Sequence, residues 1–72
     1  MAEIRFSYNK LWKILIDKRM TKKTLMERTG VSKATFAKMN KGDSVTLDVL
    51  ARLCKELNVD IGDVVEIEKE LF

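Results

Sequence analysis

Lysine is the residue type through which this chain could most readily do chemistry. Histidine, the commonest general base and metal ligand, is absent. Cys54 is the single cysteine, so the chain can form neither an internal disulfide nor a cysteine-based zinc site. The three glycines are isolated from one another, which excludes a glycine-rich phosphate loop. Because no nucleophile, base and orienting group can be assembled from these residues, we expect no enzymatic activity, no cofactor and no metal.

The charged residues are distributed unevenly along the chain. Residues 1–42 contain eleven basic and three acidic residues, a net charge of +8. Residues 43–72 contain three basic and eight acidic residues, a net charge of −5. A basic half suits a phosphate-bearing partner, although like charges on solvated helix faces are also common without any partner. Charge by itself therefore leaves nucleic acid and an ordinary solvated surface as open alternatives.

The length of the chain predicts one domain that spans residues 1–72, because domains are seldom smaller than about 50 residues. No apolar run approaches the roughly 20 residues that a bilayer requires, so we expect no contact with a membrane. The N-terminus lacks the apolar segment of a secretory signal. Together with the lone cysteine, these features predict a cytoplasmic location.

Apolar spacing and capping residues predict four helices and one further turn. The first helix starts after a cap at Ser7 or Asn9 and runs to residue 19. The others are 22–29 after Thr21, 33–41 after Ser32, 47–58 after Thr46, and a turn at 61–64 after Asp60, with Asp63 in its first turn. Gly30 and Gly42 are expected to end the second and third helices. The expected buried faces comprise Tyr8, Leu11, Trp12, Leu15 and Ile16 in the first helix and Leu47, Leu50, Ala51, Leu53, Cys54 and Leu57 in the fourth.

Alternating apolar and polar residues predict a short strand near each end of the chain, at about 3–7 and 65–69. Two isolated strands are marginal in water, so we expect them to pair, with Arg5 near Glu66 and Glu68. Whether they pair within one chain or between two chains stays open. The expected fold class is mainly α with two short strands.

Residues 21–42 predict a helix-turn-helix, in which the second helix enters the DNA major groove. Gly30 permits the turn between the two helices, and Leu25, Val31, Phe36 and Met39 are expected to fill the space beneath the second helix.

This stretch resembles the Cro/lambda-repressor-like (XRE-type) helix-turn-helix family, and the similarity extends over roughly residues 11–64. The family commonly has Gln at the position of Lys22 and Ala at that of Met26. The resemblance implies a five-helix DNA-binding domain. The matching residues are Met20, Thr21, Leu25, Gly30, Val31, Ser32, Thr35, Phe36, Met39, Lys41, Gly42, Thr46, Leu47 and Leu50.

The resemblance also implies the residues that contact DNA. The base-reading positions fall on Ser32, Lys33, Ala34 and Lys38, with Thr35 and Ala37 at the margin. Lysine can donate to guanine O6 and N7, and an alanine methyl can touch the thymine methyl, so we expect half-sites that contain guanine. The expected phosphate contacts, which set register, are Lys18, Arg19, Thr21, Lys22, Lys23, Asn40 and Lys41.

The sequence thus favours a sequence-specific, double-stranded DNA-binding transcriptional regulator that represses by occupying an operator. It is expected to act as a homodimer on half-sites about 34 Å apart, without a small-molecule ligand. The candidate dimer surfaces are the terminal strands with Leu71 and Phe72, or the exposed part of the fourth helix. The alternative is a protein-interaction or antitoxin-like module that uses the acidic C-terminal half.

Overall fold

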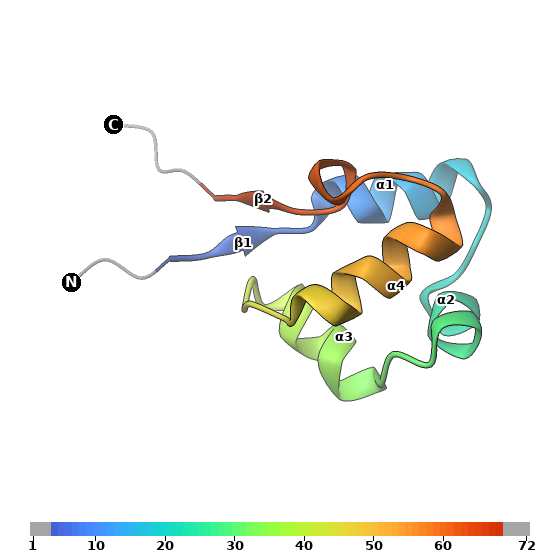
Figure 1. The fold of residues 1–72 in the computed structure, drawn as a ribbon, viewed down its shortest axis with the longest axis horizontal. Coiled ribbons are helices and arrows are strands. Elements are labelled where there is room, and N and C mark those ends of the chain that lie inside the picture. Colours follow the sequence, from blue (N-terminus) through green and yellow to red (C-terminus); the bar gives the residue numbers. More distant parts are fainter. Residues whose placement is uncertain (1–3, 69–72) are drawn as a thin grey trace.

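The computed structural model describes residues 4–68 of the chain. Four α-helices, one 3-10 turn and two short strands make up the described part, and Figure 1 shows their arrangement. In chain order the elements are β1 (Phe6–Ser7), α1 (Asn9–Asp17), α2 (Lys22–Thr29), α3 (Lys33–Asn40), α4 (Leu47–Leu57), η1 (Ile61–Asp63) and β2 (Glu66–Ile67). The outer parts of the predicted strands, and Leu71 and Phe72, lie outside the described residues.

All four helices contribute to one hydrophobic core, across which α4 runs between α1 and α3 (Figure 1). Among the described residues, no polar or charged residue other than Tyr8 is buried, and the Tyr8 hydroxyl donates to the Asp43 carbonyl oxygen at 2.8 Å. No described helix is both long enough and apolar enough to cross a bilayer. The buried residues are Tyr8, Leu11, Leu15, Leu25, Val31, Phe36, Met39, Leu50, Leu53, Leu57 and Val64.

The predicted buried faces of α1 and α4 are largely confirmed, with three errors. Ile16 is 74% exposed, because it follows Leu15 directly and a helix turns by about 100° per residue. Leu47 is 73% exposed, because it is the first residue of α4 and lies at the edge of the core. Ala51 is also exposed. Trp12 and Cys54 are partly buried, as core residues at the margin of the helix stripe.

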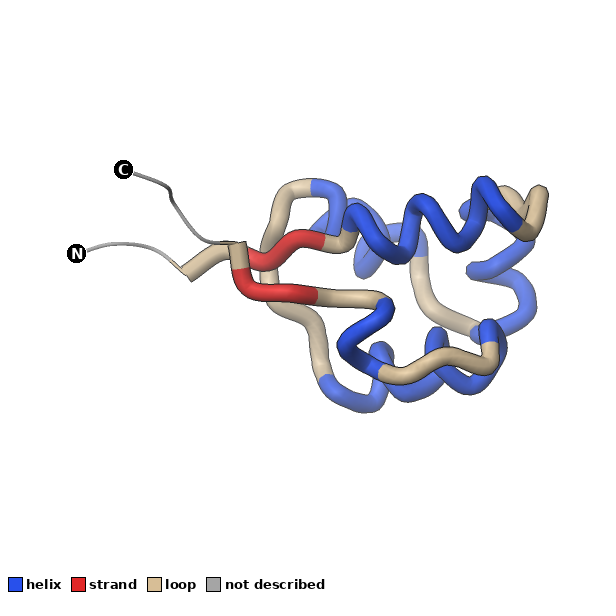
Figure 2. Tube along the Cα trace, turned by 90° about the horizontal axis from the view of Figure 1, so that it is seen from above, coloured by secondary structure: helices blue, strands red, loops and turns tan. Residues whose placement is uncertain are grey.

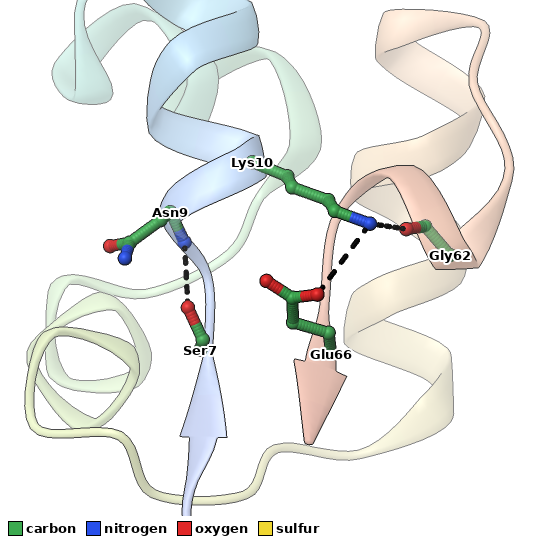
Figure 3. Close-up of polar contacts among 5 residues, drawn as sticks. All are labelled: Ser7, Asn9, Lys10, Gly62 and Glu66. Atoms are coloured by element: carbon green, nitrogen blue, oxygen red, sulfur yellow. Dashed lines mark hydrogen bonds and ion pairs between the residues drawn. The ribbon is translucent and has the colours of Figure 1, made fainter. Parts of the chain in front are cut away.

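The ends of α1 differ from the prediction. Tyr8 occupies the N-cap without a side-chain hydrogen bond, and Asn9 is already the first helical residue. The Ser7 hydroxyl accepts from the Asn9 backbone N–H at 3.4 Å (Figure 3). The helix ends at Asp17 rather than at Arg19, whose φ of 55° lies in the left-handed region. The basic pair Lys18 and Arg19 therefore forms the turn after α1 instead of its last helical residues.

The two strands pair within one chain, as an antiparallel ribbon with Phe6 opposite Ile67. Figures 1 and 2 show this ribbon extending from one end of the helical body. The Glu68 backbone N–H donates to the Arg5 carbonyl oxygen at 2.9 Å, so Arg5 lies beside the acidic strand as expected. Its guanidinium, however, donates to the Lys41 carbonyl oxygen at 2.7 Å and forms no ion pair with a described glutamate.

The acidic strand is instead held by α1. Lys10 Nζ lies 3.6 Å from a carboxylate oxygen of Glu66 and donates to the Gly62 carbonyl oxygen at 3.3 Å (Figure 3). A cation that reaches both the turn before β2 and β2 itself fixes the ribbon against the first helix.

The expected fifth helix is wrong for the described residues, which contain four α-helices and a single 3-10 turn, η1. Only three residues lie between the Asp60 cap and Val64, whose backbone N–H bonds back to Ile61 at i−3 spacing. That is too short for an α-helical turn to continue before the strand. The predicted caps are confirmed, because Asp60 and Asp63 form a reciprocal capping box.

Candidate nucleic-acid interface

The helix-turn-helix is bounded by the side chains that the sequence indicated. The Thr21 hydroxyl accepts from the Thr24 backbone N–H at 3.1 Å and starts α2. Gly30, with φ of 74°, ends that helix in the left-handed conformation that glycine adopts without steric cost. The Ser32 hydroxyl then accepts from the Thr35 backbone N–H at 3.2 Å and starts α3. Each cap satisfies a backbone donor that the first turn of a helix leaves free.

The inner faces of the two helices are buried, as predicted. Leu25 is fully buried in α2, and Phe36 and Met39 are buried in α3, with Val31 buried between the helices. Met26, which stands where the related family commonly has Ala, is partly buried and packs against the core. Since apolar contacts occupy only one side of α3, the opposite side of this helix is left to solvent.

The predicted base-reading residues lie on the outer side of α3. Ser32, Lys33, Ala34, Ala37 and Lys38 are exposed, and Thr35 is half-buried. The hydroxyls of Ser32 and Thr35 lie 3.0 Å apart, so each already has a hydrogen-bond partner. Lys33 and Lys38 form no ion pair with a described carboxylate. The described part of the chain therefore leaves an exposed ridge along α3 with two ammonium groups that no described carboxylate neutralises.

Three short segments hold the predicted phosphate contacts, and all seven residues are exposed. Lys18 and Arg19 follow α1. Thr21 caps α2, and Lys22 and Lys23 lie in the first turn of that helix. Asn40 and Lys41 lie at the end of α3. The structure brings two of them together across 18 positions of sequence, because Lys22 Nζ donates to the Asn40 side-chain oxygen at 3.0 Å. The complete set is Lys18, Arg19, Thr21, Lys22, Lys23, Asn40 and Lys41.

Three of the basic residues outside the candidate interface form ion pairs, whereas the basic residues proposed for the interface form none with a described carboxylate. The ion pairs among the described residues join Lys10 to Glu66, Arg28 to Glu56 and Arg52 to Asp48. The basic side chains proposed for base or phosphate contact take no part in these ion pairs. They are Lys18, Arg19, Lys22, Lys23, Lys33, Lys38 and Lys41. Unneutralised basic groups around one supersecondary unit provide the electrostatic footprint of a phosphate-binding surface.

Sequence reasoning missed two features that adjoin this surface. Arg5 reaches the end of α3 through the hydrogen bond to Lys41, a long-range contact that strand alternation cannot indicate. A hollow of about 280 Å³ beside α3 is lined by Lys38 and by residues of the loop and helix that follow, including Ser44 and Thr46. The polar groups of this hollow come from α3 and from the loop between α3 and α4, and the path of that loop depends on tertiary packing.

Cys54 lies outside this surface, on α4. Burial raises the pKa of its thiol above the ordinary value, and the carboxylates of Asp60 and Asp63 raise it further. A thiol held in its protonated form is a poor nucleophile, which agrees with the expected structural role of this residue.

Comparison with known proteins identifies the family to which this helix-turn-helix is similar. A model of the Cro/C1-type HTH DNA-binding domain matches residues 10–70 of the chain. The chain is also similar to the crystal structure of the transcriptional regulator VanUg in its form II, with 51% sequence identity and a TM-score of 0.88. That similarity covers 97% of this chain and 93% of the VanUg chain. No curated protein matches the chain.

Proposed function

The chain belongs to the Cro/C1-type helix-turn-helix DNA-binding domain family, and we propose that it is a transcriptional regulator that reads the major groove of double-stranded DNA with α3. The observation that carries this proposal is the exposed ridge of α3, where Lys33 and Lys38 lack internal carboxylate partners. The similarity to VanUg, itself a transcriptional regulator, supports the regulatory role. Occupation of an operator by this small domain would repress by excluding other proteins from the same DNA.

We assign base reading to Lys33 and Lys38, with Ser32, Ala34 and Thr35 beside them. Both lysines have free donors for guanine O6 and N7. The phosphate contacts are assigned to the cations and polar groups that surround α3. Lys18, Arg19, Lys23 and Lys41 supply charge, and the remaining members of the set are Thr21, Lys22 and Asn40. Contacts of this kind fix orientation on the duplex and carry no sequence information.

A two-fold dimer completes the proposal, because a single recognition helix reads only a few base pairs. An apolar groove of about 250 Å³ lies between the terminal ribbon and the start of α4, and thus joins both surfaces that the sequence suggested for dimerisation. Leu47, Ile61 and Ile67, which line it, are 73%, 40% and 59% exposed. The Phe6 N–H donates to the Gly42 carbonyl oxygen at 2.9 Å, so the outer edge of β1 is engaged while that of β2 has no partner among the described residues.

Selection of random duplexes on the purified protein tests the proposal. We expect a recovered motif with two-fold symmetry and guanine in each half-site. The logarithm of the binding constant should fall with the logarithm of salt concentration, by about 0.9 for each phosphate neutralised. Lys33→Ala should relax the preference at one base position, whereas Lys55→Ala, on α4, should leave the motif and the affinity unchanged. Retention without sequence preference, or affinity that does not respond to salt, contradicts the proposal.

A second candidate function is protein docking through the acidic half, and one observation favours it. Asp60 and Asp63 flank the exposed Ile61, while Glu66 and Glu68 flank the exposed Ile67. An apolar groove with acidic borders suits a basic amphipathic segment of a partner. Under this alternative, substitution of Ile61 by Ser abolishes capture of the partner and leaves duplex binding intact. If the groove instead joins two copies, the same substitution converts dimers to monomers in analytical ultracentrifugation.

A further inference from the structure

Lys22 makes contacts that a plain phosphate-binding lysine does not need. Its ammonium lies 4.1 Å from the centroid of the Trp12 ring and 3.0 Å from the side-chain oxygen of Asn40. Trp12 belongs to α1, Lys22 is the first residue of α2, and Asn40 is the last residue of α3. One side chain therefore joins three helices.

Both contacts are of kinds that stabilise a fixed geometry. A cation over the face of a tryptophan is attracted by the negative charge density of the ring. A hydrogen bond from an ammonium group is stronger than one between neutral groups. Trp12 also contacts α3, since the centroid of its ring is 6.1 Å from the centroid of the Phe36 ring, with the two ring planes tilted by 45°. Lys22 thus reaches α3 directly through Asn40 and indirectly through Trp12 and Phe36.

One further polar side chain holds the end of α3, because the Arg5 guanidinium donates to the Lys41 carbonyl oxygen at 2.7 Å. The buried side chains of α3 are Phe36 and Met39, and the outer side of the helix is exposed. A polar tie at the last residue of such a short helix limits rotation about its two apolar anchors.

The adjacent lysine, Lys23, lies in different surroundings. Lys23 has the same side chain, lies in the same first turn of α2 and is exposed, yet it contacts neither an aromatic ring nor a polar side chain among the described residues. A lysine that served only as a phosphate contact would have the surroundings of Lys23.

We propose that Lys22 and Asn40 are positioning residues, which hold α3 at the angle in which it is presented to DNA, and that Lys22 acts through Trp12 and Asn40 rather than as a phosphate contact. The proposal rests on DNA binding by α3 as the function of the domain. It separates Lys22 and Asn40 from the remaining residues assigned to phosphate, and it gives the single tryptophan of the chain a part in the same clamp.

The salt dependence of duplex binding distinguishes the two roles. Lys22→Met and Lys23→Met are compared, because methionine keeps an unbranched apolar chain as far as the ε-carbon, with sulfur in place of one methylene, and lacks the ammonium group. We expect Lys22→Met to lower affinity for the preferred duplex about fivefold with an unchanged slope of log K against log salt. Lys23→Met should reduce the magnitude of that slope by about 0.9, as loss of one phosphate contact requires. A slope that falls equally in both variants overturns the proposal.

Measurements without DNA test the clamp independently of the proposed function. Trp12 is the only tryptophan, so its fluorescence reports on the ammonium above it. The emission should shift in Lys22→Met and not in Lys23→Met, and Lys22→Arg, which keeps a cation and donors, should restore both emission and affinity. The effects of Lys22→Met and Asn40→Ala on unfolding should be non-additive in a double-mutant cycle.

Unchanged Trp12 emission together with additive effects on unfolding contradicts the clamp even if the protein binds DNA well. If instead the wild-type chain binds no duplex, the proposed function fails, while emission and the cycle still decide whether Lys22 and Asn40 hold α3.

Discussion

The helix-turn-helix and the C-terminal elements that support it begin their helices by the same device and use their charges in opposite ways. Thr21 and Ser32 cap α2 and α3, and Thr46 and Asp60 cap α4 and η1. In the C-terminal elements, however, several carboxylates have internal partners. Asp48 pairs with Arg52, Glu56 pairs with Arg28, and the two carboxylates of the capping box accept from backbone N–H groups at η1. In α2 and α3, the lysines have no carboxylate partner among the described residues, and Arg28, which pairs with Glu56, is the exception among the basic residues of these helices.

The two regions also differ in what makes them stable. α4 has 11 residues and buries Leu50, Leu53 and Leu57, whereas α2 and α3 have eight residues each and bury only one and two. Isolated helices of about eight residues are not stable in water, so α2 and α3 depend on packing against α4 and α1. The difference teaches that α4 has the largest buried face of the four helices, onto which the shorter helices pack, while the lysines of α2 and α3 are left without internal carboxylate partners.

The largest effect should come from a substitution that removes this dependence. Leu53→Ala truncates a fully buried side chain of α4 and should lower the free energy of unfolding by about 2–5 kcal/mol. If the helix-turn-helix depends on α4, far-UV circular dichroism and Trp12 fluorescence will report one shared thermal transition at a lower temperature. Separate transitions for the two probes would contradict the dependence, and Ala51→Ser, at an exposed position of the same helix, serves as the control.

Removal of one charge from each region should separate binding from stability. Lys38→Ala should weaken binding to the preferred duplex by about 1–3 kcal/mol, because a base contact is lost. It should leave the midpoint of urea denaturation nearly unchanged, since the side chain is exposed. Glu56→Gln removes the carboxylate 3.4 Å from Arg28 and should change stability by less than about 1 kcal/mol without affecting DNA binding. Equal loss of DNA affinity in the two variants would end the distinction between the regions.

The left-handed glycines should respond unequally, since Gly30 lies within the helix-turn-helix and Gly42 at its junction with the C-terminal elements. A Cβ at Gly42, where φ is 80°, would lie 3.1 Å from the Phe6 carbonyl oxygen. At Gly30, where φ is 74°, the nearest atom would be a guanidinium nitrogen of Arg52 at 4.0 Å. Gly30→Ala should therefore cost only the backbone penalty of roughly 1–2 kcal/mol, and Gly42→Ala somewhat more. Chemical denaturation of both variants measures this difference, and an equal cost would show that the ribbon moves freely to accommodate the new methyl group.

The smallest effect concerns Tyr8, which ties the first helix to the same junction through its hydrogen bond to Asp43. Tyr8→Phe should lower the free energy of unfolding by about 0.5–1.5 kcal/mol at neutral pH, as expected for one hydrogen bond. Burial raises the pKa of Tyr8, and the Asp43 carboxylate raises it further. The folded state thus favours the neutral phenol, so this stabilisation is complete below the ordinary pKa of about 10 and is lost as pH rises through the raised value.

Alkaline denaturation of the wild type and of Tyr8→Phe measures that loss, because this is the only tyrosine in the chain. The stability of the variant should fall less steeply above about pH 10. Parallel curves would show that the phenol ionises equally well in the folded and unfolded states.

Capping and turn chemistry were predictable because they depend on neighbouring residues. Thr21, Ser32, Thr46 and Asp60 cap the helices that the sequence assigned to them, and Gly30 and Gly42 adopt positive φ as expected. The buried apolar residues of the helix-turn-helix were predictable for a related reason. They are Leu25, Val31, Phe36 and Met39. Helical spacing together with the turn at Gly30 fixes which side of each helix faces the other.

By itself the sequence determined which segments become helices, where the turns lie and which residues form the outer side of α3. Only the tertiary structure decided that Ile16 and Leu47 are exposed, that η1 is a single 3-10 turn, and that the strands pair within one chain. It also decided the partners of Lys22, since Trp12 and Asn40 are separated from it by 10 and 18 positions. Local backbone preferences act over a few residues, whereas the partner of a long side chain depends on how whole helices pack.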